Sequence, residues 1–304
     1  MSAVEFPLSW ETPPAPRFDA QIIPLPVSRY RWYALAELPD VFSLPDLLRR
    51  MEADSGRGMV IRGCPQALAD RLSRSGFECL ITGQEAVLEL DRPPRWKKAV
   101  RYLVRLGQKT GTLSREAFSA HNLARLEQLR LESAHGSEPQ LRHLFRTQWQ
   151  AEHTCFVFRQ GEKWLGALTV SYIGRQKALT ELLLRHRNAP QGVMESLVDF
   201  AARELQREGV ALFSLGEAPF VPPTDVPLSI KERLFVSAAK RALFAYNYRG
   251  LYRFKNKFSP QWRAVYLCGR PRLGLLSLAE MFWKSNLHRL SWHKLTRAVP
   301  GRKR

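Results

Sequence analysis

The order of apolar segments between residues 155 and 215 constrains the fold of this chain more than any other feature. CFVFRQGEKWLGALTVSYIG predicts a strand hairpin with its turn at residues 160–162, and KALTELLLRHR predicts a third strand. After a turn that ends at Gly192, VMESLVDFAARELQREG has helical spacing and stops at Gly209, and VALFSLGEAPF predicts a further strand. Strands that alternate with a helix in this order predict an α/β unit.

A weaker copy of this alternation occupies residues 20–90. LPDLLRRMEA and PQALADRLSRSG have helical spacing, GMVIRG predicts a strand, and FECLITGQEAVLEL predicts two short strands around Thr82 and Gly83. The order in 155–215 resembles that of an N-acetyltransferase-like unit, so we expect two such units in an α/β (α+β) fold with mixed sheets flanked by helices. We divide the chain into a Pro-rich extended arm, an N-terminal unit, a basic linking helix, a C-terminal unit and a basic amphipathic tail, at residues 1–28, 29–92, 93–112, 113–270 and 271–304.

Positive charge is concentrated in two regions of the chain. The 304 residues carry 47 Lys and Arg against 28 Asp and Glu, which gives a net charge of +19. Residues 246–304 hold many of these cations with Glu280 as their single acid, and residues 92–115 are basic with no acid at all. Charge that served general solubility would be scattered, whereas concentrated charge is typical of proteins that bind nucleic acid, anionic lipid or another acidic partner.

Several functional classes find no support in the sequence. None of the four cysteines belongs to a CxxC pair, and the histidines lack the spacing of metal ligands, so we expect no metal site. No GxSxG motif indicates a serine nucleophile. No apolar run reaches the ~20 residues of a membrane span, and the N-terminus does not resemble a signal peptide, so we expect a cytoplasmic protein.

The stretch GLYRFKNKFSPQW, residues 250–262, alternates basic and aromatic side chains. If it is extended, Arg253, Lys255 and Lys257 share one face, because side chains of a strand point alternately to its two sides. Phe254 and Phe258 then anchor the other face. This arrangement favours contact with phosphates or with a developing negative charge, and a solvated edge strand is the alternative.

Three segments resemble, in the same order, parts of the C-terminal catalytic domain of phosphatidylglycerol lysyltransferases. They are GQEAVLELDR with the basic helix after it, GVMESLVDFAARELQREGVALFSLGEAPF, and YNYRGLYRFKNKFSPQWRAVYL, and the resemblance covers roughly residues 55–270. It implies a tandem N-acetyltransferase-like fold and transfer of an amino acid from aminoacyl-tRNA, the co-substrate, to a hydroxyl of a membrane lipid such as phosphatidylglycerol. It implies no other cofactor. Family members usually carry transmembrane flippase helices, so we expect a separate membrane flippase as a possible partner.

The resemblance and the chemistry of ester transfer together suggest site residues. Transfer requires that the reactants are positioned, that the proton of the hydroxyl is accepted, and that the tetrahedral oxyanion is stabilised. The expected catalytic residues are Lys257, Glu217 and Glu195. The expected substrate-binding residues are Arg185, Glu181, Asn247, Arg253 and Lys255. Phosphates of tRNA or lipid are expected to contact Lys97, Lys98, Arg101 and Arg105 on the basic helix.

The sequence departs from the family pattern at two of these positions. The family motif DLMR is LLLR here, at residues 182–185, and Glu181 stands one residue earlier. Glu217 occupies a position that is commonly apolar in the family. A displaced carboxylate leaves the identity of the amino acid open.

The segment LGLLSLAEMFWKSNLHRLSWHKL predicts one amphipathic helix near the C-terminus. Phe282, Trp283 and Leu287 lie on its apolar side, which is typical of a helix at a membrane surface, and a helix docked on the protein body is the alternative. With the basic ending RKR, it predicts peripheral binding to the anionic inner face of the membrane.

Two further functions stay open. One is a non-catalytic lipid- or nucleic-acid-binding member of the family. The other is an acyl-CoA-dependent N-acyltransferase, although RNAPQGVM offers one glycine and a proline where a pyrophosphate-binding loop needs several glycines before a helix.

Overall fold

The computed structural model describes residues 6–12, 18–39, 43–54, 56–223, 226–242 and 247–298. Its strands are β1 (Trp10–Glu11), β2 (Asp19–Leu25), β3 (Tyr30–Glu37), β4 (Gly58–Pro65), β5 (Glu78–Glu89), β6 (Thr112–Glu116), β7 (Thr154–Gln160), β8 (Lys163–Ile173), β9 (Lys177–Arg185), β10 (Leu212–Pro219) and β11 (Gln261–Arg270). Its helices are α1 (Leu44–Asp54), α2 (Gln66–Arg74), α3 (Lys98–Gln108), α4 (Ala120–Glu132), α5 (Val193–Arg207), α6 (Ile230–Ala242), α7 (Tyr248–Asn256), α8 (Leu275–Lys284) and α9 (Leu287–Ala298).

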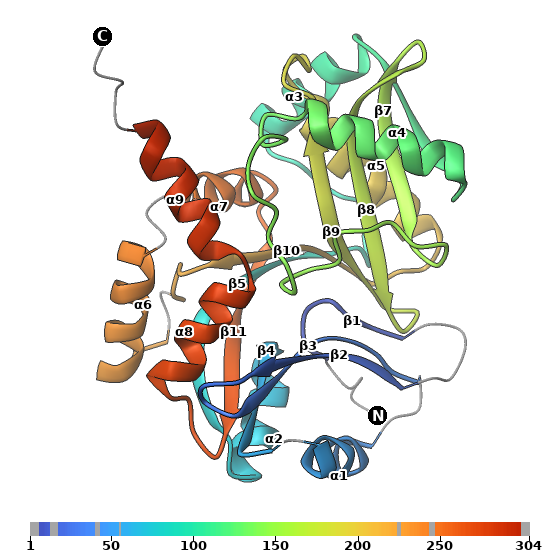
Figure 1. Cartoon of the computed structure of the whole chain (residues 1–304). Coiled ribbons are helices and arrows are strands. Elements are labelled where there is room, and N and C mark those ends of the chain that lie inside the picture. Colours follow the sequence, from blue (N-terminus) through green and yellow to red (C-terminus); the bar gives the residue numbers. More distant parts are fainter. Residues whose placement is uncertain are drawn as a thin grey trace, which may run out of the picture.

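Within these residues the strands form one mixed sheet (Figure 1). Their order is β1-β3-β4-β11-β5-β10-β9-β8-β7-β6, and β2 pairs with β3. The pair of β9 and β10 is parallel, as are the pairs that β3 makes with β1 and β4, and the other pairs are antiparallel. The expected α/β fold, a mixed sheet flanked by helices, is confirmed.

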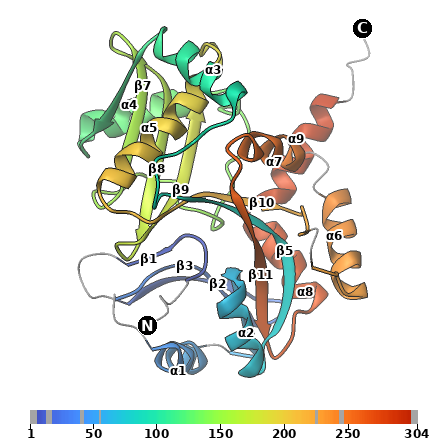
Figure 2. The same cartoon turned by 180° about the vertical axis from the view of Figure 1, so that it is seen from behind.

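The C-terminal half follows the predicted segment order closely. β7 and β8 form the expected hairpin, β9 follows, and α5 then leads into β10. Helices α4 and α5 cover opposite faces of β7, β8 and β9, as both views show (Figures 1 and 2). The α5 side of this sheet is filled by buried aromatic and aliphatic side chains, among them Phe156, Phe158, Leu197 and Phe213.

The N-terminal half is completed by a strand from the far end of the chain. β11 lies between β4 and β5, so residues 261–270 pair with two strands from the first 89 residues of the chain. Successive residues of these strands enter different cores: Tyr33 and Cys268 pack with α1 and α2, whereas Trp32 and Leu267 pack with Met281 of α8. Since β5 also pairs with β10, the sheet runs through both expected units, and the division at residues 92, 112 and 270 stays a prediction.

The structure corrects several expected segments. FECLITGQEAVLEL forms one strand, β5, because Gly83 is paired on both sides, with Val265 of β11 and with Pro219 of β10. Residues 250–262 are not extended: they lie in α7 up to Asn256 and enter β11 only at Gln261. The expected single tail helix is two helices, α8 and α9, which are separated at Ser285 and Asn286.

The two ends of the expected domain division are only partly described. The expected extended arm contains strands β1 and β2, and its residues 1–5 and 13–17 lie outside the described part of the chain. After the basic helix, residues 112–116 form β6, and α4 begins at Ala120 after the N-cap residue Ser119. The basic ending at residues 302–304 also lies outside the described residues.

Close contact between α3 and α5 depends on two glycines. Gly192, the N-cap residue of α5, has φ of +90°, and a Cβ atom there would stand 2.1 Å from the carbonyl oxygen of Leu103 in α3. A Cβ atom on Gly107 would stand 2.3 Å from Oγ of Ser196. The backbones of the two helices therefore meet at a distance that larger side chains cannot occupy.

We expect Gly192→Ala to destabilise the protein more than Gly209→Ala. Gly209 also has a positive φ, of +80°, but a Cβ atom there would meet nothing within 4 Å. Both variants carry the cost of a left-handed alanine, about 1–2 kcal/mol. Gly192→Ala adds a clash between helices, which typically costs about 1–3 kcal/mol more. Urea unfolding of both variants measures the difference, and equal losses would contradict the proposed close contact.

Candidate functional site

The central feature of the site is a cavity at the point where β9 and β10 separate. The two parallel strands pair over three residues only, ending at the pair of Leu179 with Ser214. A bulge between Ser214 and Glu217, in which Gly216 has φ of +82°, then continues β10 along β5. The space that opens beside β9 is a cavity of about 1230 Å³.

The walls of this cavity are mainly apolar and come from distant parts of the chain. Its lining includes residues 179–184 of β9, residues 215–217 of β10, and side chains of α6, α7 and α8. The segment after α4 contributes Leu141, Leu144 and Phe145, and the N-terminal arm contributes Leu8 and Ser9. A cavity of this size and lining suits a ligand with a large apolar part.

Helix α7 places the amine of Lys255 in the cavity wall. Asn247 begins this helix, and its Oδ1 accepts a hydrogen bond from the backbone N–H of Gly250 at 2.9 Å. Lys255 is buried, and its Nζ donates to the carbonyl oxygen of Glu217 at 2.7 Å. Burial lowers the pKa of Lys255 to about 7, against the opposing effect of the carboxylates of Glu217 and Glu85. Near neutral pH this amine can therefore both accept and donate a proton.

A half-buried ion pair lies in the same wall. The carboxylate of Glu217 accepts a hydrogen bond from the guanidinium of Arg62 on β4 and a second, at 3.3 Å, from Oγ1 of Thr82 on β5. Arg62 also donates to the carbonyl oxygen of Leu144 at 3.1 Å. These contacts fix the orientation of the Arg62 guanidinium, which lines the cavity.

The second carboxylate of the cavity, Glu181 on β9, is held by three donors. Its oxygens accept from Oγ of Ser9 at 3.0 Å, from Oγ of Ser171 at 2.7 Å and from the backbone N–H of Arg146 at 2.8 Å. Burial raises the pKa of Glu181, and these hydrogen bonds oppose that effect. The carboxylate thereby connects the arm, β8 and the segment after α4 at one point of the wall.

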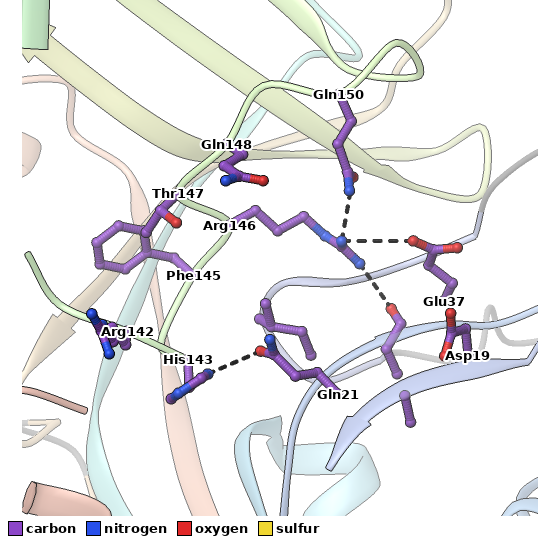
Figure 3. Close-up of a pocket in the computed structure, with 13 residues that line it drawn as sticks. Asp19, Gln21, Glu37, Arg142, His143, Phe145, Arg146, Thr147, Gln148 and Gln150 are labelled. Atoms are coloured by element: carbon purple, nitrogen blue, oxygen red, sulfur yellow. Dashed lines mark hydrogen bonds and ion pairs between the residues drawn. The ribbon is translucent and has the colours of Figure 1, made fainter. Parts of the chain in front are cut away.

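A smaller, polar pocket of about 380 Å³ lies on the other side of residues 142–146 (Figure 3). The Arg146 guanidinium extends across it, donates to the carbonyl oxygen of Ala36 at 3.3 Å, and lies 3.8 Å from the carboxylate of Glu37. It also forms an ion pair with Glu11 at 3.0 Å. Because the backbone N–H of Arg146 contacts Glu181, this one residue fixes the wall between the two pockets.

Two of the expected catalytic residues lie together outside the cavity lining. Nζ of Lys257 donates to Oε1 of Glu195 at 2.8 Å, in the first turn of α5. The Lys257 side chain is 43% exposed, whereas Glu195 is buried. The structure therefore brings Glu217 and Glu181 together with Lys255 in the cavity, and pairs Lys257 with Glu195 elsewhere.

The other expected residues are dispersed. Arg185 donates to the carbonyl oxygen of Ala189 at 2.8 Å in the turn before α5. Arg253 is exposed on α7. The cations expected to contact phosphates are exposed along the basic helix, whose buried side packs through Val100 and Val104: Lys97, Lys98, Arg101 and Arg105.

Arg62, Ser9 and Arg146 were not among the site residues expected from the sequence. Arg62 gave a signal, since it interrupts an otherwise apolar strand, GMVIRG, at a position that proves half-buried. Ser9 and Arg146 lie in irregular segments with no periodic pattern, and their partner Glu181 is distant in sequence. Their roles follow from tertiary contacts alone.

The fold and the cleft between diverging strands define the class of N-acetyltransferase-like α/β proteins. Within this class, residues 40–269 match the family described as "Phosphatidylglycerol lysyltransferase, C-terminal", and the chain belongs to that family. A phosphatidylglycerol lysyltransferase of Bacillus subtilis (strain 168) is 32% identical over 95 residues, which are 31% of this chain and 11% of that protein. The match thus spans only a small part of that relative.

Solved structures share the fold. L-PGS from Bacillus licheniformis superposes with a TM-score of 0.63 at 19% identity, over 82% of this chain and 78% of that one. The C-terminal domain of a protein described as a lysylphosphatidylglycerol synthetase from Agrobacterium fabrum superposes with a TM-score of 0.61 at 22% identity. The match covers 78% of this chain and 76% of that one. FemX superposes with a TM-score of 0.54 at 11% identity, over 87% of both chains.

Among the helices in the described part of the chain, none combines the length and the apolar character that crossing a bilayer demands.

We expect the stability of the protein relative to Lys255→Met to increase with pH. Between the folded pKa of about 7 and the ordinary value of 10.5, the unfolded chain holds a proton that the folded protein has lost. Wild-type stability therefore rises across this window, by at most about 1.4 kcal/mol per pH unit from this group. Lys255→Met removes that dependence.

Urea unfolding of the wild type and Lys255→Met at pH 7 and pH 9 measures this effect. Lys257→Met is the control, because its side chain is half exposed and paired with Glu195. A stability difference between wild type and Lys255→Met that stays constant from pH 7 to pH 9 would show that Lys255 titrates normally.

Proposed function

We propose that this protein transfers an amino acid from aminoacyl-tRNA to a hydroxyl of a membrane lipid such as phosphatidylglycerol. Membership of the lysyltransferase family supports transfer of this type. The observation that carries the proposal is the amine of Lys255, buried in the wall of a large apolar cavity with a pKa near 7. An apolar cavity accommodates part of a lipid, and the amine supplies proton transfer where the headgroup hydroxyl would react.

In the proposed reaction, the neutral amine of Lys255 accepts the proton of the lipid hydroxyl. The hydroxyl oxygen bonds to the carbonyl carbon of the aminoacyl ester, and a tetrahedral oxyanion forms. The bond from this carbon to the ribose oxygen then breaks, and the Lys255 ammonium returns a proton to that oxygen. Lys255 is catalytic in this proposal, in place of Lys257.

The two carboxylates of the cavity act as positioning residues in this proposal. Glu217 orients the Arg62 guanidinium, which can contact a lipid phosphate or the developing oxyanion. Glu181 already accepts three hydrogen bonds, so an amino group of the substrate would have to compete with Ser9, Ser171 and Arg146. We therefore assign Glu181 to holding the cavity wall.

The start of α5 disfavours the acyl-CoA alternative. A pyrophosphate binds at a helix N-terminus whose backbone N–H groups are open to it. Here Gly192 packs against the backbone of α3, and the buried carboxylate of Glu195 occupies the first turn with Lys257 as its partner. The first turn is thus already occupied by this ion pair, which leaves its N–H groups less open to a pyrophosphate.

We expect Lys255→Met to lower the single-turnover rate of transfer by about 10²–10⁴-fold, the usual contribution of a general acid and base. The assay incubates the protein with labelled aminoacyl-tRNAs and phosphatidylglycerol, and counts label in the organic extract. Lys257→Met is the matched control and should keep a saturating rate close to that of the wild type.

Two outcomes would redirect this proposal. A large loss in Lys257→Met with activity retained in Lys255→Met would support the catalytic role expected for Lys257 from sequence. Absence of transfer from every aminoacyl-tRNA, together with binding of lipid or tRNA, would support a non-catalytic binding protein.

The exposed cations of α3 are proposed to contact the phosphates of tRNA. The triple variant Lys98→Ala/Arg101→Ala/Arg105→Ala should bind aminoacyl-tRNA more weakly, and its affinity should depend less on salt. Each lost phosphate contact reduces the slope of log K against log salt concentration by about 0.7–0.9. Filter binding across a salt series measures the slope, and an unchanged slope would place tRNA on another surface.

A further inference from the structure

Exposed apolar side chains gather on helices α6 and α8. Ile230 and Leu234 are one helical turn apart on α6, and both are largely exposed. On α8, Leu275 is 86% exposed, Leu276 is 60% exposed and Trp283 is 65% exposed. We call these five residues the α6–α8 face. Side chains of this kind rarely stay in water as a group unless they meet a partner.

The large cavity opens at this face. Leu234 and Leu275 belong to the cavity lining, although each is mostly exposed, so both stand at its mouth. Helices α6 and α8 lie side by side in both views (Figures 1 and 2). Phe282, on another side of α8, lines the cavity itself. The same two helices therefore form the mouth of the cavity and the exposed apolar surface around it.

Charge around the α6–α8 face indicates which partner it meets. Arg233, Arg272 and Lys284 are exposed on or beside these helices. The acid of α8, Glu280, is occupied by hydrogen bonds from Ser28 and from the backbone N–H of Val27. Leucine and tryptophan side chains bordered by cations suit a bilayer with anionic headgroups, where the apolar groups enter the interface and the cations meet phosphates.

We propose that the α6–α8 face lies on the surface of an anionic bilayer, so that the cavity mouth opens toward the lipids. This proposal deepens the proposed function, because it names the route by which a lipid hydroxyl reaches Lys255. Helix α8 lies beyond residues 40–269, which match the family, whereas α6 lies within them. Binding to the bilayer requires neither tRNA nor catalysis.

Vesicle flotation without tRNA tests the proposal. The wild type should float with vesicles of phosphatidylcholine and phosphatidylglycerol, and much less with phosphatidylcholine alone. Leu276→Gln/Trp283→Gln should weaken binding at least about tenfold, because two side chains no longer enter the interface. Neither residue belongs to the cavity lining. The matched control is Leu131→Gln/Tyr102→Gln, which changes a leucine that is 64% exposed and an exposed aromatic residue elsewhere, and it should float as the wild type does.

Three results would overturn the proposal. The first is equal flotation of the wild type and Leu276→Gln/Trp283→Gln, and the second is an equal loss in the control variant. The third is a self-associated wild type that Leu276→Gln/Trp283→Gln converts to a monomer without changing flotation, since the face would then bind a second copy. Circular dichroism and thermal melting of each variant exclude unfolding as the cause of a loss.

Transfer assays separate this proposal from the proposed function. Leu276→Gln/Trp283→Gln should transfer slowly to phosphatidylglycerol in vesicles and at the wild-type rate to the same lipid in detergent micelles. Equal loss in both would show that these side chains do not act through docking. If no protein transfers in either format while flotation still depends on the face, the docking proposal stands and the transferase proposal fails.

Discussion

Strands β9 and β10 pair over only three residues before the bulge at Gly216 carries β10 along β5, and the site is built around the resulting gap. A parallel pair that continued would bring the end of β10 against residues 180–184 and leave no cavity. Gly216 has φ of +82°, a conformation that favours glycine, and it lies beside Nζ of Lys255. β5 supports the divergence, because it pairs with β10 on one side and β11 on the other.

The surroundings of the Lys255 amine disfavour its charged form, and this lowers its pKa. Its hydrogen-bond acceptor is a carbonyl oxygen of the backbone, while the nearby carboxylates have other partners: Glu217 is bound by Arg62, and Glu85 lies 2.8 Å from Lys177. The lysine is thus buried without a carboxylate of its own, which is why burial outweighs attraction and its pKa falls. A direct ion pair with a carboxylate would instead favour the ammonium form of a buried lysine.

The sequence predicted the segment order, the basic helix and the family, because these depend on local periodicity and on contiguous motifs. It did not predict which lysine enters the cavity. Alternating basic and aromatic residues suggested an extended stretch, but Asn247 caps a helix at this point. Residues two apart on a helix point in widely different directions, so Lys255 turns inward and Lys257 turns toward α5. Arg62 and Ser9 reach the site through tertiary contacts that no local pattern contains.

Both ends of the described chain complete a cavity whose centre lies in the family match. Residues 40–269 supply Lys255, Glu217 and Glu181, yet Ser9 binds Glu181 from the arm, and α8 contributes to the cavity lining. Without the arm and α8, the cavity would lack the part of its lining that these two segments supply. Glu181 is therefore held by Ser171 and Arg146 from within the matched region and by Ser9 from outside it. The arm and α8 line the same cavity as Lys255, so segments on either side of the matched region shape the surroundings in which burial lowers the pKa of this amine.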